Sequence, residues 1–118
     1  MNSYNTNIEK IKPTGKSNGK SIILTDQICF SWGYSSKKNM VSSIGVKLAG
    51  LGYDVTINHK QDIGRGSIFK IFLNLNGNEI LVFSSNNRDN DGKAIISSYP
   101  SFVVQDIIDL IVSEIEGN

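Results

Sequence analysis

The chain has 118 residues, with a hydrophobic fraction of 39%, a charged fraction of 19% and a formal net charge of +1. These values fit one globular domain and exclude an overall field that would attract nucleic acid or an anionic membrane. The one cysteine excludes an intramolecular disulfide and suits a reducing compartment. Since the N-terminal residues show no apolar signal segment, we expect a cytoplasmic protein.

The N-terminal part of the chain differs in character from the rest of the sequence. Residues 1–20 are rich in Asn, Ser, Lys and Gly and show no apolar period, which predicts a flexible polar tail. The segments Ser21–Leu24 and Gln27–Ser31 are apolar enough for a central strand of a sheet. The polar pair Thr25 and Asp26 between them is a candidate interruption of this strand.

A helix is predicted from Ser35 to about Gly50, because apolar residues recur there every three or four positions. Ser35 or Ser36 would cap its start, and Gly50 and Gly52 would end it. Gly45 lies in its middle and costs about 1 kcal/mol relative to alanine, which indicates either close packing or a weak helix. The expected buried stripe consists of Met40, Val41, Ile44, Leu48 and Leu51.

Three further strands are predicted after this helix. Tyr53–His59 alternates between apolar and polar residues, as a half-buried strand does. The strands Ile68–Leu75 and Glu79–Ser84 flank Asn76 and Gly77, a strong hairpin signal because both residue types tolerate positive φ.

A final helix is predicted to open at Pro100. The predicted order is therefore β-α-β-β-β-α, in which the first β-α-β unit can be a right-handed parallel crossover. We expect a fold of the α/β class (α+β with a mixed sheet), in which helices pack on a four-stranded mixed sheet, within one domain over residues 21–118. The apolar stripe of the last helix is expected to be Val103, Ile107, Leu110, Ile111 and Ile115.

Cys29 is the candidate catalytic residue, because an apolar strand ends at this thiol and a turn then leads into a helix. Unpaired N–H groups at a helix start favour thiolate, and such sites lower a thiol pKa from about 8.5. Lys37 and Lys38 would add to this effect. A buried cysteine also serves commonly as a small hydrophobe, so a reactive and a structural Cys29 both stay open.

Several short motifs occur in a fixed order over roughly residues 21–116. They resemble those of the selenoprotein W family, also called Rdx proteins, whose members are small and thioredoxin-like. The matching segments are Cys29–Trp32 followed by Gly33 and Tyr34, the glycine-rich turn Gly64–Phe69, the hairpin residues Asn76 and Gly77, the strand Leu81–Ser84, and the pair Tyr99 and Pro100.

This resemblance implies a thioredoxin-like fold, and either thiol oxidoreductase activity or the binding of glutathione and thiol-containing partner proteins. The family has a second redox residue where this chain has Trp32, so only Cys29 can inherit a redox role and a local disulfide cannot form. One hypothesis is a monothiol redox or glutathione-linked protein acting through Cys29. The other is a non-catalytic interaction module whose contact surface is the turn of Phe30, Ser31, Trp32, Gly33 and Tyr34.

Histidine and aspartate are the other residue types that could carry chemistry. His59 is the one histidine of the chain, so neither a metal site nor a Ser-His-Asp arrangement is predicted around it. Asp54 and Asp62 are expected to be solvated residues at a turn and a strand edge.

Two nucleic-acid or nucleotide interpretations are disfavoured by the pattern. Gly15–Ser17 and Gly19–Ser21 resemble pieces of a phosphate-binding loop, but both lack its first glycine and the second precedes a predicted strand. Residues 35–116 share the element order of a double-stranded-RNA-binding domain, but the last helix has no basic residues at its start.

Overall fold

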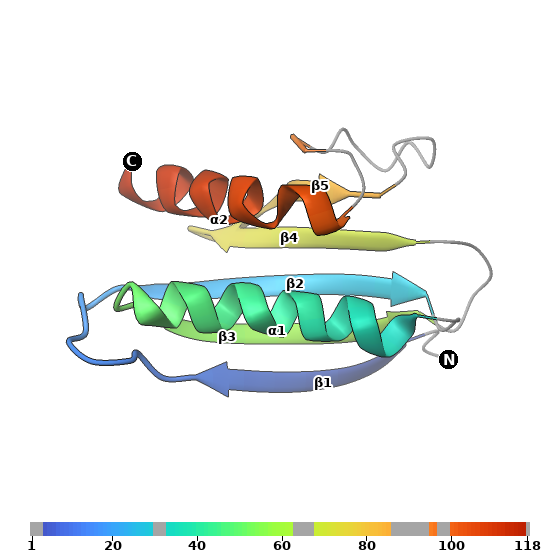
Figure 1. The fold of residues 1–118 in the computed structure, drawn as a ribbon, viewed down its shortest axis with the longest axis horizontal. Helices are drawn as coiled ribbons and strands as arrows, with labels where there is room; N and C mark the ends of the chain where they lie inside the picture. Colours follow the sequence, from blue (N-terminus) through green and yellow to red (C-terminus); the bar gives the residue numbers. More distant parts are fainter. Residues whose placement is uncertain (1–3, 30–32, 63–67, 86–94, 97–99, 118) are drawn as a thin grey trace.

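The computed structural model describes residues 4–29, 33–62, 68–85, 95–96 and 100–117. In these residues five strands form one sheet, and two helices lie over one of its faces (Figure 1). In chain order the elements are β1 (Tyr4–Ile11), β2 (Ser21–Cys29), α1 (Tyr34–Gly50), β3 (Asp54–Asp62), β4 (Phe69–Leu75), β5 (Asn78–Ser84) and α2 (Pro100–Glu116).

The sheet is mixed, with the strand order β1-β3-β2-β4-β5. β2 and β3 are parallel and are connected by α1, whereas every other neighbouring pair is antiparallel. α1 lies over β2 and β3, and α2 lies over β5 (Figure 1). The predicted mixed sheet with helices on one face is confirmed, but it has five strands where the sequence predicted four.

The additional strand is β1, in the segment predicted to be a flexible tail. β1 pairs along its whole length with β3. The connection to β2 is also tied down, since the Thr14 N–H donates to the Ala49 carbonyl and the Asn18 N–H to the Gly52 carbonyl, each at 2.9 Å. The tail prediction is therefore wrong from Tyr4 onward. β1 has few apolar residues, so its sequence shows no hydrophobic period that would predict a strand. It becomes a strand through its pairing with β3.

β2 runs without the interruption that was expected at Thr25 and Asp26. Both side chains are buried, and each has a hydrogen-bond partner on a neighbouring strand. Since β2 has a strand on each side, its backbone groups stay paired through this polar pair. β3 likewise continues past the predicted end at His59, as far as Asp62.

α1 begins at Tyr34, with Gly33 as its N-cap in the left-handed region (φ 84°) and no side-chain cap. The predicted Ser35 or Ser36 cap is therefore wrong. The buried stripe is confirmed for Val41, Ile44 and Leu48, while Met40 is partly buried. Leu51 lies beyond the helix and is 56% exposed, so it does not belong to the stripe.

Gly45 is a point of close packing between α1 and the sheet. A Cβ atom at this position would lie 2.8 Å from Cδ1 of Ile11 on β1 and 2.8 Å from Cδ1 of Ile57 on β3. The absence of a side chain lets α1 approach both strands, which explains a glycine inside a helix.

The C-terminal half agrees with the sequence prediction in its type and order of elements. Asn76 (φ 53°) and Gly77 (φ 83°) form the turn between β4 and β5, and both adopt the positive φ that a two-residue hairpin requires. α2 starts at Pro100 as predicted. Val103, Ile107 and Ile111 of its expected stripe are buried against the sheet, and Leu110 and Ile115 are partly buried.

The core lies between the helices and the sheet, and strand alternation decides which residues face it. On β2 these are Ile22, Leu24 and Ile28, and on β3 they are Val55 and Ile57. The same alternation turns Asp26 and His59 toward the core.

Candidate functional site

The predicted redox turn connects β2 to α1. Cys29 is the last residue of β2, Gly33 is exposed, and Tyr34 is partly buried at the first position of α1. The first turn of the helix closes with a hydrogen bond of 3.0 Å from the Lys37 N–H to the Gly33 carbonyl. Phe30, Ser31 and Trp32, the other predicted contact residues, lie outside the described residues.

Cys29 is 2% exposed. It pairs with Asp62 in the β2–β3 register, and its N–H donates to the Ile68 carbonyl at 2.9 Å. Strand alternation places Cys29 on the same face as Gln27 and on the opposite face from Asp26. The structure thus gives Cys29 the burial that is typical of a cysteine used for packing.

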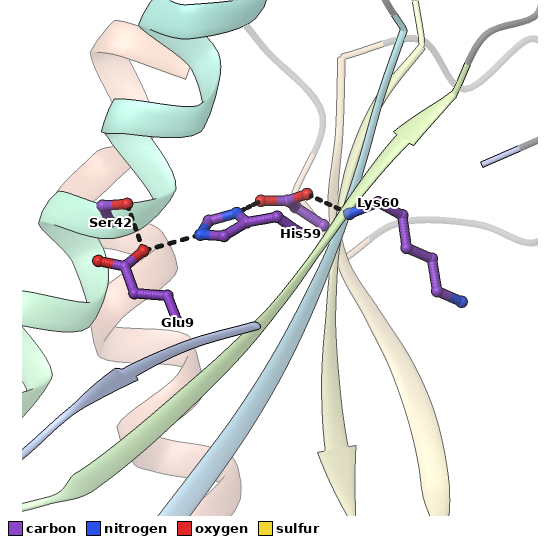
Figure 2. Close-up of polar contacts among 5 residues, drawn as sticks. Glu9, Ser42, His59 and Lys60 are labelled. Atoms are coloured by element: carbon purple, nitrogen blue, oxygen red, sulfur yellow. Dashed lines mark hydrogen bonds and ion pairs between the residues drawn. The ribbon is translucent and has the colours of Figure 1, made fainter. Parts of the chain in front are cut away.

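Among the described residues, Glu9, His59 and Asp26 form a connected group of ionisable side chains, which we call the carboxylate–imidazole chain. His59 is 1% exposed and lies on β3, between Glu9 on β1 and Asp26 on β2. Its Nε2 lies 2.7 Å from Glu9 Oε1, and its Nδ1 contacts Asp26 Oδ2. Figure 2 shows the His59 ring with both nitrogens engaged. Since carboxylates only accept, both contacts are hydrogen bonds when the imidazole is doubly protonated.

Further hydrogen-bond donors contact the carboxylate–imidazole chain at both of its ends. The Ser42 hydroxyl of α1 donates to Glu9 Oε1 at 2.7 Å, and the Lys60 N–H donates to Asp26 Oδ1 at 3.1 Å (Figure 2). The Lys60 side chain points to the other side of the sheet from the His59 ring (Figure 2). Three strands and one helix are therefore joined by buried or half-buried polar contacts.

The environment shifts the pKa values of this group in a consistent way. Burial acts to lower the pKa of His59, but the hydrogen bonds and charges of Asp26 and Glu9 outweigh it and raise the pKa above 6.5. Burial acts to raise the pKa of Glu9, but hydrogen bonds from His59 and Ser42 and nearby positive charge lower it below 4.5. Both shifts favour an imidazolium held between carboxylates.

Tyr34, the first residue of α1, is influenced by the charge of Asp26 in the carboxylate–imidazole chain. Burial first, and the Asp26 charge second, raise the pKa of Tyr34 above 10.0. The start of α1 therefore lies within electrostatic reach of the carboxylate–imidazole chain, although Cys29 faces away from Asp26.

The carboxylate–imidazole chain is arranged as a structural element and not as the active site of a hydrolase. A serine nucleophile needs a base that accepts its proton, which in a triad is a histidine nitrogen. The Ser42 hydroxyl instead donates to Glu9, whose lowered pKa makes it a weak base. The ion pairs of His59 link β1 to β3 and β3 to β2.

A second polar contact lies on the sheet face opposite the helices. Gln27 Nε2 donates to Asp62 Oδ2 at 3.1 Å. Asp62 is 8% exposed, so the prediction of a solvated Asp62 is wrong, because β3 is longer than expected and places this residue beside β2. Asp54, in contrast, is partly exposed, and its carboxylate lies 3.8 Å from Lys12 Nζ.

The residues of the carboxylate–imidazole chain were missed at the level of sequence, although part of the signal was present. His59 has the same parity as Val55 and Ile57, and Asp26 has the same parity as Ile22, Leu24 and Ile28. A polar residue at an inward position needs a partner, and two such residues on neighbouring strands can supply one another. Glu9 gives no such signal, because the sequence of β1 does not predict a strand.

Other classes of site find no support in the described part of the chain. Among the described residues, no group of His, Cys, Asp and Glu is arranged to hold a metal ion. None of the helices described is long and apolar enough to cross a membrane.

Comparison with known proteins gave no relative. No family model matches the chain, and searches of curated proteins and of solved structures found no match.

Proposed function

We propose that this protein is a thioredoxin-like protein of the selenoprotein W type that works by binding a partner protein and not by thiol turnover. The fold supports this assignment at the level of element order. A parallel β2-α1-β3 unit is followed by the antiparallel hairpin β4-β5 and by α2, and the cysteine-containing turn connects β2 to α1. β1 is an addition at the edge beside β3.

The observation that carries the proposal is the 2% exposure of Cys29. Disulfide exchange requires a thiolate that can reach a sulfur atom of its partner in line with the bond to be broken. A thiol this deeply buried cannot be approached in this way without local opening. Since Trp32 also stands where a second thiol would resolve a mixed disulfide, two independent features oppose turnover.

The contact surface in this proposal is the turn from Phe30 to Tyr34. Its sequence includes Trp32, a residue type that often anchors protein interfaces, directly before Gly33, which is exposed. Cys29 then acts as a packing residue at the base of the turn.

The alkylation rate of Cys29 tests the proposal directly. We expect iodoacetamide to modify the folded protein at least about a hundredfold more slowly than the urea-unfolded protein, because reaction must wait for local opening. Incubation with glutathione disulfide should give no mixed disulfide by mass spectrometry. A folded thiol that reacts readily with an apparent pKa well below about 8.5 would establish the monothiol or glutathione-linked hypothesis instead.

Partner binding is tested with matched substitutions in the turn. In pull-down experiments, Cys29→Ser should retain the partners of the unmodified protein, and Trp32→Ala should lose them. If Trp32→Ala retained every partner while Cys29→Ser lost them, the thiol and not the aromatic side chain would be the binding group.

A further inference from the structure

A groove of about 640 Å³ lies between α1 and α2 on the helix-covered face of the sheet. Met40 of α1 and Val104 of α2 provide its partly exposed apolar surface, and the buried Phe69 of β4 and the serines Ser36 and Ser43 of α1 also line it. Its volume is within the range of about 300–1,000 Å³ that is typical of ligand sites. Met40 is unbranched and flexible, so this surface can adapt to an incoming side chain.

Two lysines of α1 border this groove, Lys37 near the start of the helix and Lys47 in its last turn. They are ten residues apart, so about 15 Å of helix separates them. Neither makes an ion pair with another described residue, whereas Lys12 pairs with Asp54 and Lys20 with Glu116. Of the described residues that line the groove, none is acidic. The groove therefore combines an apolar floor with two separated positive charges that the described residues leave uncompensated.

We propose that this α1–α2 groove binds an acidic amphipathic helix of a partner protein. Such a helix would place apolar side chains against the partly exposed Met40 and Val104, in the helix-in-groove mode. Two acidic side chains about ten residues apart on it would meet Lys37 and Lys47, because the rise per residue is the same in both helices. A ligand with one carboxylate would meet only one of the two lysines.

Among the described residues, α2 of a second copy does not supply such a helix. Its described exposed residues include Gln105, Asp106 and Asp109, and its described large apolar residues are buried or partly buried against its own core. The inference rests on the proposed function, in that it assumes a protein that works by binding. It concerns a surface other than the Phe30–Tyr34 turn. A reactive Cys29 would therefore contradict the proposed function, whereas a groove that binds no peptide would contradict only this inference.

The test uses a fluorescein-labelled alanine-based helical peptide with leucines along one face and two glutamates about ten residues apart. A second peptide has lysines in place of the glutamates. Fluorescence anisotropy with the full chain should show binding of the glutamate peptide and at least about tenfold weaker binding of the lysine peptide. Equal affinity for both peptides, or no binding of the glutamate peptide, would overturn the proposal.

Charge reversal locates the site. Lys37→Glu/Lys47→Glu should weaken binding of the glutamate peptide at least about tenfold and should bind the lysine peptide better than the unmodified protein does. The matched control Lys10→Glu/Lys16→Glu makes the same change in net charge at two exposed positions outside the groove, and should stay within about twofold. Equal losses in both variants would mean non-specific attraction and would overturn the proposal.

A variant that fills the groove tests the contribution of its apolar surface to peptide binding independently of the two lysines. Ser43 lines the groove and is exposed, so Ser43→Trp should occupy it without disturbing the core. We expect this variant to keep the circular dichroism spectrum of the unmodified protein and to lose at least about tenfold in affinity. Unchanged affinity in the folded Ser43→Trp protein would place the peptide elsewhere and refute the groove as its site.

Discussion

Asp26 and His59 lie directly opposite each other in the parallel pairing of β2 and β3, and their side chains form an ion pair in the interior of the protein. Each is 1% exposed. Two buried ionisable groups at one register position are tolerated because each satisfies the other, and because Glu9 and the Lys60 N–H occupy their remaining polar atoms.

Breaking this pair from one side should destabilise the protein strongly. We expect His59→Ala to lower the free energy of unfolding by about 3 kcal/mol, because it leaves the Asp26 carboxylate buried without its partner. Urea unfolding followed by circular dichroism measures this change. Asn58→Ala, on the same strand but the opposite face, is the matched control and should stay within about 0.5 kcal/mol.

The double variant Asp26→Ala/His59→Ala tests whether the two residues act together. Its cost should be clearly smaller than the sum of the two single costs, because no buried charge is then left alone. Additive costs would contradict the coupling of these two residues.

Stability should depend on pH in a window set by His59 and Glu9. The pKa of folded His59 lies above 6.5, so its contribution is fully present below pH 6.5 and is lost as pH rises through the folded pKa. The pKa of folded Glu9 lies below 4.5, so its contribution is present above pH 4.5 and is lost as pH falls through the folded pKa. These two groups therefore stabilise the fold most between pH 4.5 and 6.5.

Urea midpoints measured across this range check the prediction. The decrease in stability above pH 6.5 should be much smaller in His59→Gln, which has no titrating ring. A decrease of the same size in the variant would assign the pH dependence to other groups.

Packing at Gly45 should show a second non-additive pair. Gly45→Ala gains about 1 kcal/mol in helix propensity but forces its Cβ against Cδ1 of Ile11 and of Ile57, which costs about 1–3 kcal/mol. We expect a net loss of stability of about 1 kcal/mol. Ile11→Val removes one of the two contacting atoms, so Gly45→Ala should cost less in the Ile11→Val background. A cost that is the same in both backgrounds would mean that α1 does not rest on β1 here.

Elements with a strong local signal could be predicted from the sequence. The Asn76–Gly77 turn requires positive φ, Pro100 starts a helix, and the apolar stripe of α1 repeats at helical spacing. β1 could not be predicted in this way, because its residues become a strand only through long-range pairing with β3. Sequence patterns report local preference, whereas an edge strand of mixed polarity is selected by its neighbour.

The candidate site also has a part that the sequence predicts and a part that it does not. The position of Cys29 at the end of a strand followed by a turn and a helix was predictable, but its burial was not, because exposure depends on what packs around the strand end. The Asp26–His59 pair required knowledge of the parallel register, which places two residues 33 positions apart in the chain side by side. A sequence can show that polar residues occupy inward-facing positions, but it cannot show which of them pair with one another.

The C-terminal end of α2 provides a spectroscopic prediction. Tyr53 is 3% exposed, and its hydroxyl donates to Glu116 Oε2 at 2.5 Å, while Glu116 Oε1 lies 2.5 Å from Lys20 Nζ. Burial, and then the hydrogen bond and charge of Glu116, raise the pKa of Tyr53 to about 12. Tyrosinate absorbance should therefore show a component that titrates near pH 12, and this component should be missing from Tyr53→Phe.

Two substitutions separate the causes of this shift. Glu116→Gln removes the negative charge and should move the Tyr53 titration toward pH 10, although burial keeps it above that value. Tyr34→Phe, the control, removes another partly buried hydroxyl and should leave the component near pH 12 in place. Because the pKa of folded Tyr53 is raised, its contribution to stability is complete below pH 10 and is lost as pH rises toward 12. A Tyr53 that titrates near pH 10 would mean that its hydroxyl is neither buried nor held against Glu116.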